Sequence, residues 1–192
     1  MIEIYGRSEI NESRNLKERH IMSWKILVYR AKPNPAGKDR VFGYSQQQQL
    51  LGEWVDLQNT GDGSVSLSTL NLCHVQFSNQ GVPEDKPTIY WTGKDGEVLN
   101  PGQILRVHTG KSAYASAMAS NDVQGVNLHA FAEEGNFVLN NNYGDIISVW
   151  WKDKDNKWYR EDVASYDPNP PEGVVLKRSG DKLIPSFDYI VR

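Results

Sequence analysis

The chain has 192 residues, enough for one well-buried core or for a β-sandwich of about 110 to 140 residues with decorated ends. Its 39% apolar and 23% charged residues argue against intrinsic disorder. No apolar run approaches the roughly 18 residues of a membrane span, and the charged segment Met1–His20 does not resemble a secretory signal, so we expect a cytoplasmic protein by default.

The N-terminal quarter is basic and the remainder is acidic. Residues 1–50 hold nine basic against five acidic residues, and residues 51–192 hold twelve against nineteen, which together give the net charge of −3. Residues 1–23 are polar and only weakly periodic, so we expect them to form an extension. The first strand of the body is predicted at residues 25–30 and ends before Pro33 and Pro35, and the glutamine run Gln46–Gln49 is predicted to lie in a loop.

Short runs that alternate apolar and polar residues follow, separated by turns rich in Gly, Asn, Asp or Pro. Strands are predicted at residues 51–59, 65–72, 88–91, 103–109 and 126–131. In the first of these, Leu51, Val55 and Leu57 share one face. Because no long helical period interrupts the series, the pattern predicts an all-β, immunoglobulin-like antiparallel β-sandwich.

Two hairpins are predicted near the C-terminus. Residues 145–151 and 157–159 flank a polar turn, and residues 174–177 and 187–191 form a second apolar pair after a proline-rich break. Such residues are too apolar for a free tail. We expect Gly173–Val191 to pack back on the sandwich, within its own chain or across a homodimer partner, and to cover an outward-facing tryptophan.

An ordered set of turns carries a family resemblance. The set comprises the alternating run from Glu53, the Thr60-Gly61 turn followed by Leu67 and Leu70, Leu99-x-Pro101-Gly102 leading to Val107-His108-Thr109-Gly110, and Asn141-x-x-Gly144-Asp145. Together these runs resemble the bacterial form of the lamin-tail domain over residues 24–159, with 160–192 as a C-terminal extension. The resemblance implies an immunoglobulin-like sandwich with a non-catalytic role; metazoan relatives bind chromatin, DNA and other proteins. The segment Gly110–Gly135 is longer than is usual in the family.

Motifs for catalysis or metal binding are not found in the sequence. Cys73 is the only cysteine, which excludes an intramolecular disulfide, and we expect its thiol to be buried and inert. The four histidines lack zinc-site spacing, and His108, beside Arg106 on a polar strand face, is expected to face solvent. There is no nucleophile elbow, phosphate-binding loop or dinucleotide motif. We therefore predict no catalytic residue, no metal and no cofactor.

Two groups of residues are the candidate binding sites. Trp54, Trp150 and Trp158 are predicted to lie on outward strand faces and to form an aromatic surface, unless the terminal extensions cover them. The basic stretch, represented by Arg30, Lys32, Lys38 and Arg40, is the candidate contact for a nucleic-acid backbone. The sequence thus predicts an interaction module that binds a protein, a nucleic acid or a surface polymer, with a carbohydrate-binding sandwich as the alternative.

Overall fold

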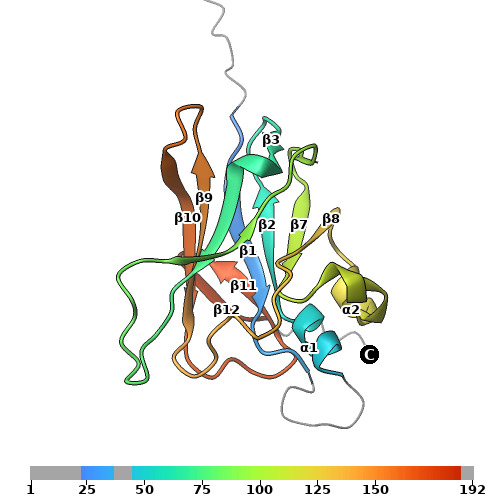
Figure 1. Ribbon diagram of the computed structural model, residues 1–192, viewed down its shortest axis with the longest axis vertical. Coiled ribbons are helices and arrows are strands. Elements are labelled where there is room, and N and C mark those ends of the chain that lie inside the picture. The colour runs from blue at the N-terminus through green and yellow to red at the C-terminus, as the bar shows by residue number, and fades with distance from the viewer. Residues whose placement is uncertain (1–22, 37–44, 187–192) are drawn as a thin grey trace, which may run out of the picture.

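The computed structural model describes residues 23–36 and 45–186, and these fold into an all-β body (Figure 1). The strands are β1 (Ile26–Lys32), β2 (Trp54–Asn59), β3 (Val65–Ser66), β4 (Leu70–His74), β5 (Thr88–Thr92), β6 (Val98–Leu99), β7 (Ile104–His108), β8 (Leu128–Phe131), β9 (Asp145–Lys152), β10 (Trp158–Tyr166), β11 (Val175–Ser179) and β12 (Lys182–Ser186). Four short helical segments accompany them: α1 (Gln46–Gly52), η1 (Leu67–Thr69), η2 (Ser112–Ala117) and α2 (Ser120–Val123). The all-β prediction is confirmed.

Ten strands form one sheet in the order β5-β4-β9-β10-β12-β11-β1-β2-β7-β8, and β3 pairs with β6. Most neighbours are antiparallel, while β10–β12 and β7–β8 run parallel. The sheet folds over, so that the half containing β4 and β9 faces the half containing β2 and β7. The two layers of the expected sandwich are therefore joined along one side, through the C-terminal hairpin.

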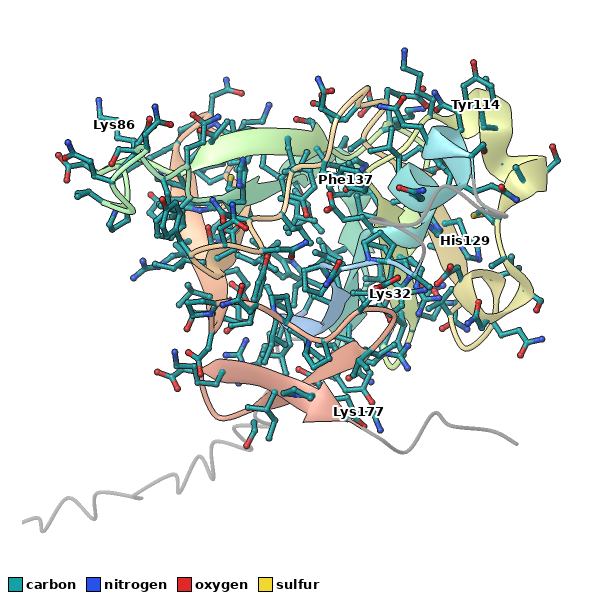
Figure 2. The ribbon with its side chains drawn as sticks, turned by 90° about the horizontal axis from the view of Figure 1, so that it is seen from below. Lys32, Lys86, Tyr114, His129, Phe137 and Lys177 are labelled. Carbon is teal, nitrogen blue, oxygen red and sulfur yellow. The ribbon has the colours of Figure 1, made fainter. Side chains whose placement is uncertain are left out.

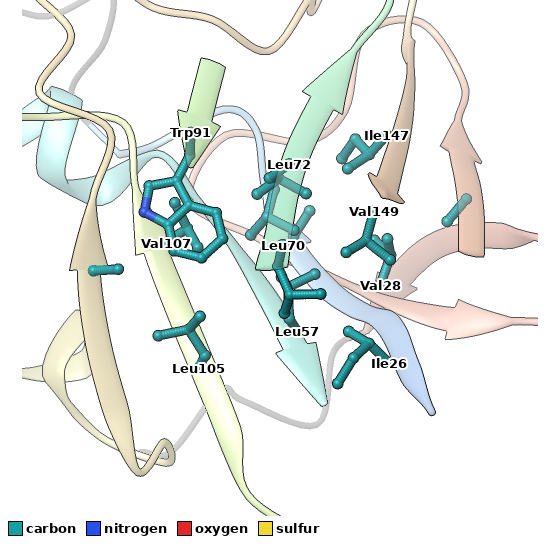
Figure 3. Close-up of a cluster of buried hydrophobic side chains, with 14 of the residues drawn as sticks. Ile26, Val28, Leu57, Leu70, Leu72, Trp91, Leu105, Val107, Ile147 and Val149 are labelled. Carbon is teal, nitrogen blue, oxygen red and sulfur yellow. The ribbon is translucent and has the colours of Figure 1, made fainter. Parts of the chain in front are cut away.

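The core lies between these two layers (Figure 3). Leu57 and Val107 from one layer approach Leu72 and Val149 from the other, and none of the four exposes any surface to solvent. Trp91 of β5 closes one side of the cluster. Each such side chain stabilises the fold by roughly 1.5–3 kcal/mol through removal of apolar surface from water. The apolar residues Val55, Leu57, Leu105 and Val107 were therefore assigned to the correct face, whereas Leu51 was placed in the same strand as Val55 and lies in helix α1.

The C-terminal hairpin is part of the main sheet. β11 pairs with β1 and with β12, and β12 also pairs with β10. Arg178 binds Asp162 with both guanidinium NH groups and donates to the Val28 carbonyl, while Asp162 accepts from the Val28 N–H. We expected this segment to pack back on the sandwich within its own chain or across a homodimer partner, and residues 173–186 pack within their own chain. Its second strand begins at Lys182 instead of Phe187, and residues 187–192 lie outside the described residues.

The glutamine run forms helix α1, so the predicted loop is wrong. Ser45 caps the helix by accepting from the Gln48 N–H, and the Gln48 side chain accepts from the Ser45 N–H. This reciprocal pair is the capping box that a serine followed three residues later by glutamine forms. Leu50 and Leu51 are fully buried and anchor the helix. None of the helices in the described part of the chain is long and apolar enough to cross a membrane.

Candidate binding surface and buried polar layer

Strands β1, β2 and β7 carry a second set of side chains on the face that points away from the core. The set, here called the buried polar layer, comprises Arg30, Lys32, Trp54, Asp56, Arg106 and His108. The sequence assigned this face to solvent because its residues alternate with the apolar ones. In the structure every member is at most 4% exposed, because α2, β8 and the segment before β11 lie beside it.

Asp56 is the centre of this layer. Its Oδ1 accepts from Arg106 Nε at 2.7 Å and its Oδ2 accepts from Arg30 Nε at 2.8 Å, so one carboxylate bridges two guanidinium groups. The Arg106 guanidinium also stacks on the indole of Trp54, 3.6 Å from the ring centroid. Charges taken out of water need such partners, because an isolated buried ion is strongly unfavourable. The layer is therefore a connected electrostatic unit.

Asp122 of α2 connects the long Gly110–Gly135 segment to this unit. Its Oδ1 accepts from Lys32 Nζ at 2.6 Å and from Trp54 Nε1 at 2.8 Å, and its carbonyl accepts from Arg106. Trp54 is consequently only 2% exposed, and its predicted place on an exposed aromatic surface is wrong. We expected the termini to cover it. In the structure α2 contacts the indole directly through Asp122, and Gly173–Val175 of the C-terminal extension line the same cavity as Trp54.

The basic stretch does not form a solvent-facing surface where the structure describes it. Arg30 and Lys32 are each 4% exposed and are paired with Asp56 and Asp122. Their charges act inside the protein, since the complementary carboxylates lie on β2 and α2. Lys38 and Arg40 lie outside the described residues.

His108 is fully buried, so its expected exposure is wrong. Its Nδ1 lies 2.6 Å from the Leu51 carbonyl, and its Nε2 lies 2.9 Å from Nδ1 of His129. Burial lowers the pKa of His108 to about 3, so the ring is neutral at pH 7, with Nδ1–H donating to Leu51 and Nε2 accepting from His129. Figure 2 shows His129 and Lys32 inside the outline of the molecule, in contrast to Lys86 and Tyr114 at its periphery.

Trp150 and Trp158, unlike Trp54, lie together on an accessible surface. They line a shallow hollow of about 200 Å³ on the outer side of β4, β5, β9 and β10, together with Ile89 and Pro87. Trp158 is 36% and Ile89 54% exposed. The indole N–H of Trp150 donates to the Ser148 hydroxyl, which fixes the orientation of that ring. Both tryptophans therefore point outward, as the strand pattern predicts.

Two cations accompany the tryptophans on this surface. In the β9–β10 ladder Trp150 pairs with Arg160, and Lys152 pairs with Trp158, so indoles and cations occupy alternate corners of a square. Lys152 Nζ lies 5.7 Å from the ring centroid of Trp158. We call Ile89, Trp150, Lys152, Trp158 and Arg160 the aromatic face. Its chemistry combines flat apolar stacking surfaces with positive charge.

The acidic residues next in sequence do not oppose this charge directly. Glu161 and Asp162 follow a register shift after Arg160 and accept hydrogen bonds from the backbone of β1. Their carboxylates are therefore engaged on the opposite side of β10. The aromatic face keeps its positive character.

Cys73 forms part of the floor of the hollow, at only 3% exposure. Burial raises the pKa of its thiol from 9.0 to about 12, which lowers the thiolate fraction about a thousandfold at neutral pH. We expect iodoacetamide at pH 8 to alkylate the folded protein at least about a hundredfold more slowly than the urea-unfolded chain. Mass spectrometry over time measures both rates, and equal rates would contradict an inert thiol.

Several residues of these sites were not identified from sequence. Arg106 was placed on a polar strand face and Asp56 was not singled out, yet the two are opposite one another in the β2–β7 ladder. Their opposite charges were the available signal. Lys152 and Arg160 alternate with tryptophans along one predicted hairpin, so the sequence also contained the signal for this cluster. Asp122 lies in a segment without periodicity, where no local pattern marks it.

The sequence matches no family model, and no curated protein is significantly similar to it.

Proposed function

We propose that this chain is a non-catalytic interaction module of the lamin-tail type, and that its aromatic face binds single-stranded nucleic acid. The lamin-tail assignment is supported by the ordered turns of the sequence together with an all-β body of the matching kind. The observation that carries the choice of partner is the alternation of Trp150 and Trp158 with Lys152 and Arg160 on one exposed surface.

The chemistry of this arrangement suits a flexible polyanion whose units carry flat rings. Bases stack on indoles irrespective of sequence, and neighbouring cations contact the phosphates. The stretch Trp150–Arg160 holds four basic residues against two aspartates, a local balance of +2 within a chain of net charge −3. The contact is therefore short and local, and the acidic remainder of the body disfavours a wider electrostatic footprint.

Burial and ion pairing leave the titratable groups discussed above in forms unsuited to catalysis. Burial raises the pKa of the Cys73 thiol to about 12 and lowers the pKa of His108 to about 3, so neither is suited to nucleophilic or acid–base chemistry at pH 7. Asp56 and Asp122 are held in ion pairs. These features support a role without turnover.

The decisive test is Trp158→Ala measured against a fluorescent twelve-nucleotide poly(dT) by anisotropy at low salt. Loss of one stacking platform is worth about 1–3 kcal/mol per base, so we expect affinity to fall about 5-fold to 150-fold. Replacing Lys152 and Arg160 together by alanine is expected to reduce the slope of log K against log salt by about 1.4, at about 0.7 per phosphate contact.

Matched controls lie outside the aromatic face, on η2, beside β8 and in the loop before η2. Tyr114→Ala removes a 44% exposed aromatic ring from η2, and the double alanine variant of Lys94 and Lys111 removes two exposed cations. Both are expected to leave the affinity for poly(dT) within about twofold, because substitutions outside the stacking site change the binding free energy little. An affinity unchanged in Trp158→Ala, or binding weaker than millimolar for the wild-type chain, would contradict the proposal.

A neutral glycan is the second candidate, because Asn71 lines the hollow beside both tryptophans and offers a polar group next to flat rings. Each aromatic stack contributes on the order of 1 kcal/mol, so a single module would bind weakly. Binding of a neutral oligosaccharide would be insensitive to salt, whereas poly(dT) binding weakens with salt. Titration of both ligands at two salt concentrations therefore separates the two functions.

A further inference from the structure

A cavity of about 210 Å³ lies between the buried polar layer, α2 and the residues that lead into β11. Its wall includes Lys32, Trp54, Arg106, Gln124, Val174 and Val175. An engineered apolar cavity of ~150 Å³ in another protein admits benzene, so this cavity has room for a compact organic molecule. It is separate from the aromatic face, which lies on β4, β5, β9 and β10.

Lys32 gives this cavity a specific polar requirement. Its side chain is 5% exposed, and an ammonium group has three N–H donors. Within the described residues one of these three donors is used, in a hydrogen bond to Asp122 Oδ1 at 2.6 Å. That oxygen also accepts from Trp54 Nε1, so it is shared between two donors. A buried ammonium with further donors beside a cavity favours a ligand that supplies acceptor oxygens.

The charge of the wall indicates the sign of that ligand. Arg30, Lys32 and Arg106 line the cavity with Asp122 as the only carboxylate on the wall among the described residues, and Asp56 lies behind the two guanidinium groups. Positive potential in a partly desolvated site is weakly screened, which favours an anion. A planar carboxylate matches guanidinium and ammonium donors in geometry and charge.

The rest of the wall combines apolar side chains with the polar residues Asn121, Gln124 and Ser186. Val174 and Val175, where β11 begins, are half-buried and line the same cavity as the cations. Trp54 also lines the cavity, and the Arg106 guanidinium stacks on its indole. In ordinary ligand sites a few polar groups fix the orientation of the ligand, and the apolar lining buries its apolar surface. A ligand with a charged head and a compact apolar body would therefore match this lining.

We infer that this cavity is a binding site for a small monocarboxylate with a compact apolar body, of the size of benzoate. The carboxylate accepts from Lys32 Nζ and lies beside the Arg106 guanidinium. The ring or alkyl body lies against Val174 and Val175.

Calorimetric titration of the full chain with sodium benzoate, benzamide and benzylamine tests the inference. The three share one ring and differ in the charge of the head group. We expect saturable one-to-one binding of benzoate in the millimolar range or tighter, and affinities at least about tenfold lower for benzamide and benzylamine, because a charge-assisted hydrogen bond is lost. Equal affinity for benzamide, or a benzoate dissociation constant above about 20 mM, equivalent to a binding free energy of about −2.3 kcal/mol, would overturn it.

Val174→Phe locates the site, because the larger side chain fills the cavity from its half-buried rim. We expect it to abolish benzoate binding, whereas Val98→Phe, on the 45% exposed side chain in β6, leaves affinity within about twofold. Thermal unfolding of both variants verifies that they remain folded. Benzoate affinity retained in Val174→Phe would place the ligand elsewhere and overturn the assignment.

Discussion

Replacing Asp56 with alanine is expected to lower the free energy of unfolding by about 3–5 kcal/mol, the usual cost of removing one partner from a buried ion pair. The carboxylate bridges Arg30 and Arg106, and it is fully buried. Without it both guanidinium groups lose a shared counter-charge, and Arg106 loses the contact that orients it over Trp54. Urea unfolding followed by tryptophan fluorescence measures the change.

The matched control is Asp167→Ala. Asp167 pairs with Lys182 at 3.0 Å, but its side chain is 82% exposed, and such surface pairs contribute about 0–1 kcal/mol. Asp56→Asn keeps the shape of the side chain and removes its charge, so it separates packing from electrostatics. An Asp56→Ala variant no less stable than Asp167→Ala would show that the polar layer does not depend on this carboxylate.

Replacing Gly144 with alanine is expected to cost about 3 kcal/mol or more, the second large effect. Gly144 has φ of 73°, and a Cβ placed there would lie 2.2 Å from the carbonyl oxygen of Tyr166. Backbone atoms of β10 would have to move, and the adjacent Asp145, which accepts from the Val75 and Ile146 N–H groups, would move with them.

Gly102→Ala isolates the conformational part of this cost. Gly102 has φ of 76°, and no atom lies within 4 Å of the added methyl group. We expect it to destabilise by about 1 kcal/mol, the penalty of left-handed backbone for a residue with a side chain. Thermal and urea unfolding of both variants compare the two, and equal losses would mean that the contact with Tyr166 is relieved without cost.

The core could be predicted from sequence because its signal is local. Leu57 and Val107 stand in runs that alternate strictly, and burial of one face is the only arrangement that such a run allows. Whether the other face meets solvent depends on segments far away in the chain. Trp54 and Arg106 have the polar alternation of an exposed face, and α2 covers them through Asp122.

The aromatic face could be predicted in part for a related reason. Trp150 and Trp158 are on the outer side of the layer formed by β5, β4, β9 and β10, and among residues 23–36 and 45–186 no inserted segment covers them. Trp54 has an equivalent position in its own strand but lies beneath the Gly110–Gly135 segment. Strand periodicity therefore identifies which residues share a face, while the loops decide which of those faces a ligand can reach.

The joining of the two layers by the C-terminal hairpin has a consequence for biosynthesis. Arg178 contacts Val28 across 150 positions of sequence, so β1 leaves the ribosome long before its partner β11 exists. Until then β1 and β10 are both edges with unpaired backbone groups, and such edges attract other strands. Contacts between residues this far apart in sequence form slowly, because the chain loses the entropy of the closed loop before the contacts stabilise it. The nascent chain is thus an open half-structure during most of its translation, and β11 and β12 complete it in one late step.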